Sequence, residues 1–123
     1  MNLVSEDKRG QIYEIGVIDG QHVNILVTKA GFMRGGHFHD YPEEFYVLWG
    51  ELHWTEAPTP VGNPGTVNNT QYAMGGLMKS QPGIPHMLYA ITDSVVVEFR
   101  PEHTPFKATD YEPMRKLIRE QLA

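Results

Sequence analysis

The chain has no cysteine among its 123 residues, and this absence narrows the sites that it can build. Without thiols there is no disulfide bond, no thiolate nucleophile and no cysteine-ligated zinc or iron–sulfur centre. A metal ion would have to be held by histidine, aspartate or glutamate. The absence also fits a reducing compartment.

Runs of basic residues and long apolar runs are also missing. Ten Lys and Arg residues against fifteen Asp and Glu residues give a net charge of -5, so we expect no nucleic-acid partner. The first eleven residues are polar where a signal peptide would place an apolar core, and no later stretch approaches membrane-spanning length. We therefore expect no membrane association and a cytoplasmic location.

Glycine and proline, in contrast, are plentiful. Twelve Gly and nine Pro residues are spread along a chain that is 41% hydrophobic. This distribution favours many short elements joined by tight turns over a helical bundle. Because the length is typical of one domain, the sequence predicts a single all-β domain over residues 1–123.

The first strands are predicted by alternation. Apolar and polar residues alternate over residues 12–17 and again over residues 23–27, with the dipeptide Asp19-Gly20 between them. An Asp-Gly pair between two alternating segments is typical of a two-residue β-hairpin turn. These residues are therefore expected to form one hairpin.

The middle of the chain contains one segment with a strong strand pattern, followed by a long segment with no pattern of helix or strand. Residues 43–49 are an aromatic and β-branched run that predicts a central strand, and residues 51–55 are interpreted as its hairpin partner. Residues 57–76 are rich in Pro, Gly, Asn and Thr and show little periodicity, so we expect a long surface loop. This loop could be a lid over a site or an insertion that contacts nothing.

The second half resumes the strand pattern. Residues 82–85 read Pro-Gly-Ile-Pro, which predicts a tight turn into a strand over residues 86–89. The valine-rich residues 94–99 predict a further strand. Pro101 and Pro105 are expected to end the sheet.

Near the end of the chain, the spacing of the apolar residues changes from that of a strand to that of a helix. Thr109 or Asp110 could cap a helix over about 110–123. One face of that helix is apolar, with Met114, Leu117, Ile118 and Leu122 at helical spacing. The helix is expected to cover the protein's own sheet; the alternative is that it binds a partner.

The histidines supply the first candidate site. His37 and His39 are two residues apart on a predicted strand, so both side chains face the same way. Glu43 follows after a short bend, and sheet pairing could bring His86 to the same point. Three imidazole nitrogens and one carboxylate oxygen suit a zinc, iron, manganese, nickel or copper ion. The histidine pair alone is equally typical of a solvated strand.

Two segments resemble the motifs of a known family. The pattern Gly31-x5-His37-x-His39-x3-Glu43-x6-Gly50 matches every fixed position of the first cupin motif. The segment from Gly75 to His86 is similar to the second motif, with Gly75, Gly83, Pro85 and His86 kept. It departs from that motif at Gln81, where proline is usual, at Gly76, where aspartate is common, and at Ala90, where asparagine follows.

The resemblance to the cupin superfamily implies a fold. That fold is a double-stranded β-helix, or jelly-roll barrel, over about residues 12–101, followed by a C-terminal helix over about 110–123. Family members usually enclose a ligand cavity. The resemblance and the open edges of a small sandwich also lead us to expect a homodimer.

The resemblance also implies a metal site inside the barrel. Glu43 and Glu44 are rivals, because only one of two adjacent strand residues faces inward, and the spacing to Gly50 favours Glu43. The expected cofactor is one divalent transition metal, such as zinc, iron, manganese or nickel. Its implied ligands are His37, His39, Glu43 and His86.

Three functions fit such a barrel. The first is a metal-dependent enzyme acting on a small polar metabolite, as a sugar isomerase, epimerase or lyase or as a dioxygenase. The second is a non-catalytic small-molecule or carbohydrate-binding module. The third is a structural subunit whose C-terminal helix docks on a partner.

No motif fixes a catalytic residue. The candidates for a base near the metal are His53, Tyr72, Lys79 and Glu98. For each of them, a surface or packing role without catalysis is the favoured interpretation. Glu98 in particular is expected to face outward from the valine run. Arg34 could pair with a substrate carboxylate or phosphate at the barrel mouth, but a solvated loop arginine is the favoured interpretation.

Overall fold

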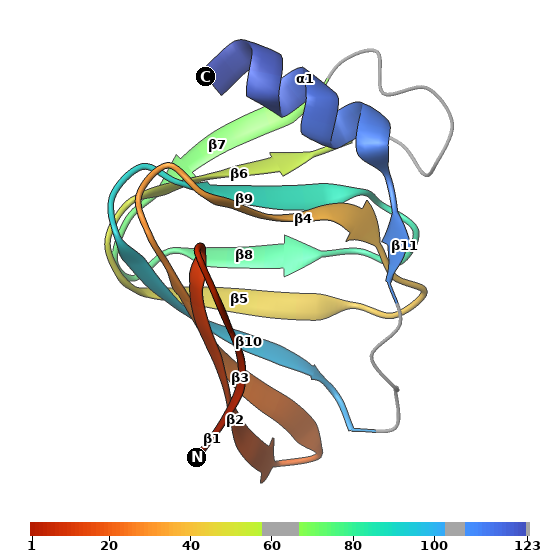
Figure 1. Cartoon of the computed structure of the whole chain (residues 1–123). Coiled ribbons are helices and arrows are strands. Elements are labelled where there is room, and N and C mark those ends of the chain that lie inside the picture. The colour runs from red at the N-terminus through yellow and green to blue at the C-terminus, as the bar shows by residue number, and fades with distance from the viewer. Residues whose placement is uncertain (58–66, 103–107, 123) are drawn as a thin grey trace.

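The computed structural model describes residues 1–57, 67–102 and 108–122, with the backbone alone at 117, 118, 121 and 122. The described strands form two antiparallel sheets that face each other (Figure 1). The six-stranded sheet has the order β1 (Asn2–Asp7), β2 (Gly10–Ile18), β3 (Gln21–Thr28), β10 (Ser94–Pro101), β5 (Glu43–Trp49) and β8 (Leu77–Ser80). The five-stranded sheet has the order β11 (Thr109–Asp110), β4 (Met33–Phe38), β9 (His86–Ala90), β6 (Leu52–Glu56) and β7 (Asn68–Tyr72).

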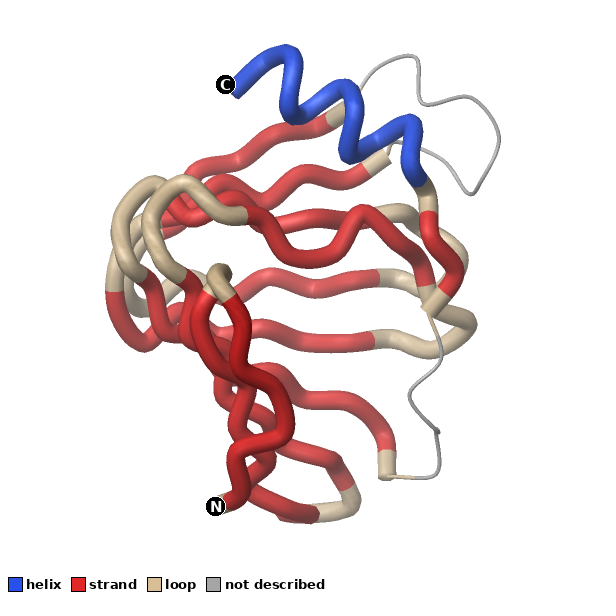
Figure 2. Tube along the Cα trace, viewed as in Figure 1, coloured by secondary structure: helices blue, strands red, loops and turns tan. Residues whose placement is uncertain are grey.

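The space between the sheets holds the main core. Side chains alternate along each strand, so every second residue points inward and joins the apolar cluster between the layers. Strand dominates the described residues, as the tube in Figure 2 shows. The predicted all-β jelly-roll architecture is therefore confirmed. The core residues are Leu26, Phe45, Val47, Leu52, Trp54, Met78, Leu88 and Val96.

The first predicted hairpin is confirmed. Strands β2 and β3 pair from Gly10 with Thr28 to Ile18 with Gln21. Asp19 and Gly20 connect them with φ angles of 50° and 74°. Positive φ at both central residues is the signature of the type I′ turn, which Asp-Gly adopts readily.

The predicted hairpin between residues 43–49 and 51–55 is wrong. Strand β5 pairs with β10 and β8, whereas β6 pairs with β9 and β7 in the other sheet. The chain crosses between the sheets at Gly50, which has φ 88° and where a Cβ atom would lie 2.2 Å from the Asp93 carbonyl oxygen. Alternation shows which face of a strand is buried, but it does not say which strand is the neighbour.

The prediction of a loop over residues 57–76 is wrong at its end. Residues 68–72 form strand β7, which pairs with β6 along its whole length. Four of its five residues are exposed polar side chains at the edge of the sheet, so no apolar alternation marks the strand. Residues 58–66 lie outside the described residues, so the choice between a lid and an insertion that contacts nothing stays open.

The C-terminal helix is confirmed with different limits. Helix α1 spans Glu112–Leu122, and the predicted caps Thr109 and Asp110 instead form strand β11 against β4. This pairing covers an edge of β4 that would otherwise be open. The Asp110 carboxylate accepts a hydrogen bond from Arg115 Nη2 at 2.9 Å, so it contacts a helix side chain.

The helix packs on the outer face of the five-stranded sheet (Figure 1). Met114 is fully buried and lies in a second apolar cluster with Met87, whose neighbours in β9, His86 and Leu88, face the barrel interior. The part of the apolar stripe that is described therefore packs on the protein's own sheet. The side chains at 117, 118 and 122 lie outside the described residues. No described helix is long and apolar enough to cross a membrane.

Candidate metal centre and cavity

The four residues of the predicted metal site lie at the ends of three strands. His37 is near the end of β4, and its register partner is His86 at the start of β9. His39 follows β4 directly, and Glu43 begins β5 in the opposite sheet. The three imidazole rings are in mutual contact range, with centroids 4.6 Å apart for His37 and His39, 5.1 Å for His37 and His86 and 5.3 Å for His39 and His86.

The ligand atoms of these residues converge. One nitrogen from each of the three histidines lies within 4.8 Å of the others. Glu43 Oε1 lies 2.7 Å from His39 Nε2 and 3.6 Å from His86 Nε2. Glu44, the rival carboxylate, points away from this group, since Glu43 is buried and Phe45 belongs to the core. The structure thus brings together all four residues that the motifs implied.

The Glu43 carboxylate shows that this group of atoms fits a metal ion. Glu43 is 2% exposed, and neither of its oxygens accepts a hydrogen bond in the described part of the chain. A buried carboxylate is strongly disfavoured unless it is hydrogen-bonded, paired or bound to a metal. The two imidazole nitrogens close to Oε1 lie at ion-pair distance but make no hydrogen bond with it, and a metal ion bound by all three groups would satisfy them together.

His86 is oriented by contacts on its other ring nitrogen. His86 Nδ1 lies 3.0 Å from Ser80 Oγ and 3.3 Å from the carbonyl oxygen of Ile84. An Nδ1–H group that donates to Ile84 leaves the lone pair of Nε2 for a metal. The ring is also stacked on Trp54 at a centroid distance of 5.2 Å. Ser80 was not predicted, because its role depends on a cross-sheet contact that no motif position marks.

Burial keeps His37 and His86 neutral. Desolvation, followed by the charge of His39, lowers the pKa of His37 from 6.5 to about 4. Desolvation, followed by the charge of His37, lowers the pKa of His86 to about 3. A neutral imidazole is the form that binds metals, so both rings are ready to act as ligands at neutral pH.

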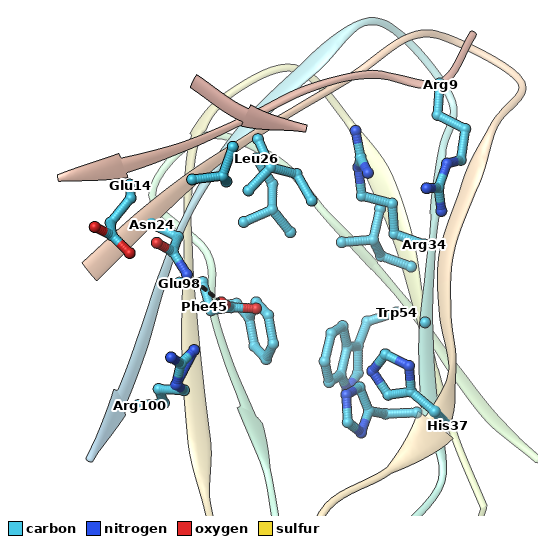
Figure 3. A pocket seen from close by; sticks show the side chains of 15 residues that line it. Arg9, Glu14, Asn24, Leu26, Arg34, His37, Phe45, Trp54, Glu98 and Arg100 are labelled. Atoms are coloured by element: carbon cyan, nitrogen blue, oxygen red, sulfur yellow. Dashed lines mark hydrogen bonds between the residues drawn. The ribbon is translucent and has the colours of Figure 1, made fainter. Parts of the chain in front are cut away.

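The metal group opens onto a cavity of about 410 Å³ between the sheets (Figure 3). His37, His86 and Trp54 form part of its wall, with Leu26, Phe45 and Leu88 as apolar lining. The charged side chains on the remaining wall are Arg9, Arg34, Arg100, Glu14 and Glu98. A mostly apolar cavity with a few placed charges is typical of a small-molecule site.

Glu98 faces into this cavity, so the prediction that it points outward is wrong. It shares its parity with Val96, which is fully buried in the core. Asn24 Nδ2 donates a hydrogen bond of 3.1 Å to Glu98 Oε1. Burial and the negative charge of Glu43 raise the pKa of Glu98 to about 7. The valine run is apolar on both parities, so its pattern could not show which side faces inward.

Arg34 also differs from its prediction as a solvated loop residue. It lies within β4 and is only 7% exposed. Arg34 Nε donates to Thr28 Oγ1 at 2.8 Å, and Nη2 donates to the carbonyl oxygen of Val27 at 2.9 Å. The guanidinium group therefore links the five-stranded sheet to the six-stranded sheet inside the barrel.

Comparison with known proteins places the fold. No family model matches the sequence, and no curated protein matches it. Solved structures do match: an RmlC-like cupin from Shewanella frigidimarina NCIMB 400 has a TM-score of 0.66 and 14% identity, covering 82% of this chain and 83% of that chain. The chain therefore has the fold of a cupin barrel.

Two further solved structures resemble this chain. The capsular polysaccharide assembling protein CapF from Staphylococcus aureus has a TM-score of 0.74 and 20% identity, over 88% of this chain and 34% of that chain. The DMSP lyase DddQ from Ruegeria pomeroyi DSS-3 has a TM-score of 0.66 and 16% identity, over 83% of this chain and 51% of that chain. The chain thus spans about a third of the length of the CapF chain that it matches.

The departures from the second cupin motif do not involve the ligands. Gly76, where aspartate is common, donates its backbone N–H to the carbonyl of Ala73 in the turn before β8, and an added Cβ would lie 2.7 Å from a ring atom of Tyr72. Ala90 is buried at the far end of β9 from His86. The residue type at these two positions therefore follows local packing in this chain.

The remaining sequence candidates are not part of the cavity wall. His53 alternates with Leu52 and Trp54, which belong to the core, so it faces away from the interior. Lys79 is exposed, and Tyr72 packs against the core. Of the four candidate bases, Glu98 is the one that lines the cavity.

Proposed function

We propose that this chain belongs to the cupins and is a metal-dependent enzyme that converts a small polar metabolite, by isomerisation, epimerisation or elimination or by dioxygenase chemistry. One observation carries the proposal: three histidines converge with a buried carboxylate that accepts no hydrogen bond in the described residues, and two of these histidines, His37 and His86, line a cavity that Glu98 also lines. Many active sites combine a metal site with a titratable side chain in an apolar cavity.

The metal would be one divalent transition ion, zinc, iron, manganese or nickel. Three neutral nitrogens and one carboxylate oxygen suit each of these ions. When bound, such an ion supplies Lewis-acid polarisation of a carbonyl or hydroxyl oxygen, or oxygen chemistry in the case of iron. The residues that would hold it are His37, His39, Glu43 and His86.

Glu98 is the residue that we assign to proton transfer. A carboxyl group with a pKa of about 7 is present in both protonation states near neutral pH, which suits a general acid or base. Asn24 holds one of its oxygens in place. Phe45, Leu88 and Trp54 line the same space with apolar surface, which excludes water from the reacting groups.

A search for substrate conversion distinguishes the proposed enzyme from a module that only binds its ligand. The protein is loaded in turn with Zn²⁺, Mn²⁺, Ni²⁺ and, without oxygen, Fe²⁺, and incubated with sugars, sugar acids and hydroxy acids while products are followed by NMR. Oxygen uptake is followed for the iron form. We expect metal-dependent conversion that falls by about 10²–10⁴-fold in Glu98→Gln, and little change in the outward-facing control Glu44→Gln. Ligand binding without conversion under every metal would contradict the enzyme and favour the binding module.

We also propose that the chain forms a homodimer through the outer face of the six-stranded sheet. Tyr46 of β5 is flanked in register by Val97 of β10 and Leu77 of β8. Tyr46 and Leu77 are 40% and 46% exposed, so the three side chains form an apolar row across three strands. Such rows favour burial against another surface.

Light scattering after size exclusion measures the oligomeric state. The wild type is expected to be a dimer, and Leu77→Asp is expected to be a monomer. Met74→Asp is the control, because Met74 is 70% exposed but lies in a turn outside the apolar row. A monomeric wild type would contradict the dimer.

A further inference from the structure

Arg34 is a buried cation whose direct contacts in the described part of the chain are all neutral. Its two hydrogen bonds go to the Thr28 hydroxyl and the Val27 carbonyl, both neutral groups, and the described residues form no ion pair with it. Burial and the nearby charge of Arg9 lower its pKa, while the charges of Asp7 and Glu98, neither of which contacts it as an ion pair, raise it. An arginine side chain stays charged in proteins. A buried charge with only neutral partners is unfavourable unless an anion joins it.

A β-bulge turns Arg34 toward the same cavity as the metal ligands. Arg34 pairs with Leu88 and His37 pairs with His86, and the register shifts by one residue between Gly35 and His37. Residues three apart on a regular strand face opposite sides, but the extra residue in the bulge restores the same side. Arg34 and His37 therefore both line the cavity, as bulges near functional sites often arrange.

The cavity has two chemically different ends. Figure 3 shows the side chains of Arg34 and Arg9 toward one end and His37 toward the other. Arg9 is already neutralised by Asp7, since its Nη2 lies 2.7 Å from Asp7 Oδ2. The unneutralised positive charge at that end is therefore that of Arg34.

We propose that Arg34 binds an anionic group of the metabolite in this cavity. The hydroxyl or carbonyl oxygens at the other end of the same metabolite would then lie at the metal. The substrate class is then a hydroxylated or carbonyl-bearing compound whose carboxylate or phosphate is several bonds away from those oxygens. A guanidinium group suits both anions because it can donate two parallel hydrogen bonds. The inference rests on the proposed function for the metal end, but the anion end can be tested without metal.

The experiment uses three six-carbon probes that differ in one group. Gluconate carries a carboxylate, sorbitol 6-phosphate carries a phosphate, and sorbitol is neutral. Binding to the metal-free and metal-loaded protein is measured by calorimetry, and the Nε–H signal of Arg34 is followed by NMR. We expect one of the anions to bind at least about tenfold more tightly than sorbitol in both forms and to shift that signal. The anion that does so identifies the source of the charge.

Variants separate anion binding from a purely structural link between the sheets. Arg34→Met keeps the bulk of the side chain and removes the charge, and Arg34→Lys keeps the charge. The control is Arg119→Met, on the exposed surface of α1 and paired with Glu112. In folded protein, Arg34→Met should lose the preference for the anion and keep metal affinity, Arg34→Lys should retain part of the preference, and the control should behave as wild type.

The outcomes distinguish this inference from the proposed function. If wild-type protein shows no preference for either anion, or if folded Arg34→Met keeps it, the inference is overturned even when metal binding and turnover are intact. If the anion binds through Arg34 but no metal binds at the histidines, the inference stands and the proposed enzyme fails.

Discussion

The two ends of the cavity satisfy their polar groups in different ways. At the charged wall, Arg34 donates to Thr28 and Glu98 accepts from Asn24, so each charged group has a local neutral partner. At the histidine end, the carboxylate of Glu43 has no hydrogen bond although it is the more deeply buried of the two acids. The charged wall therefore meets part of its hydrogen bonding within the chain, although Arg34 makes no ion pair among the described residues, whereas the histidine end needs a cation to balance its polar atoms.

The largest effect is expected from removing a ligand at the histidine end. His86→Ala or His37→Ala should weaken metal binding by at least about 100-fold, since even the loss of a supporting hydrogen bond weakens metal binding by 10–100-fold. His53→Gln is the matched control, because this imidazole faces away from the interior. Competition with a chelating dye gives the affinities, and equal affinity in His86→Ala and His53→Gln would show that the metal binds elsewhere.

The next effect concerns the support of His86. Ser80→Ala removes the hydroxyl 3.0 Å from His86 Nδ1 and should weaken metal binding by about 10–100-fold. Ser94→Ala removes an equally buried hydroxyl that has no hydrogen-bond partner in the described residues, so metal affinity should not change. The same chelator competition measures both, and equal losses would indicate a general packing effect.

The sequence predicted one end of the cavity better than the other, and the two ends show why. Three of the four ligand candidates lie within one short stretch of chain: His37 in β4, His39 directly after β4, and Glu43 at the start of β5. A local sequence motif can therefore show that they lie close together. Arg34 is turned inward by a bulge, and Glu98 lies in a run whose two faces are both apolar. Their directions depend on register with neighbouring strands, which a single sequence does not contain.

The same limit explains the errors in the fold. The strand over residues 43–49 and the Asp19-Gly20 hairpin are local patterns and were predicted correctly. The partner of β6 is set by the crossing at Gly50 between the two sheets. Strand β7 is exposed on an edge and therefore carries no apolar signal. Tertiary pairing overrides local pattern at both places.

Substitution of Glu43 is expected to change metal affinity and the free energy of unfolding in opposite directions. Glu43→Gln removes a buried charge that accepts no hydrogen bond in the described residues and should stabilise the metal-free protein by about 1–2 kcal/mol while it weakens metal binding. The control Glu44→Gln should change neither quantity. Urea unfolding in EDTA measures the free energy of unfolding, and a clear destabilisation by Glu43→Gln would contradict the view that this end is unbalanced without a cation.

The smallest effect is a difference in pH dependence between the ends. The lowered pKa values of His37 and His86 mean that stability is lost as pH falls from 6.5 toward 4. The raised pKa of Glu98 has the opposite sign, so its contribution is lost as pH rises from 4.5 to about 7. Glu98→Gln should therefore gain stability relative to wild type between pH 5 and pH 8, on the order of 1 kcal/mol.

Urea unfolding of the two proteins in EDTA at both pH values measures this gain. A gain of equal size at pH 5 and pH 8 would show that Glu98 does not titrate in this range, and would remove the reason to assign it proton transfer.

Metal content is the most direct test of the central claim that the histidine end is a metal site. Protein without a histidine tag is purified without chelator and analysed for its elements, beside the double variant His37→Ala, His86→Ala. We predict about one transition-metal ion per chain in the wild type and very little in the variant. A metal-free wild type that also fails to take up metal on reconstitution would contradict the claim.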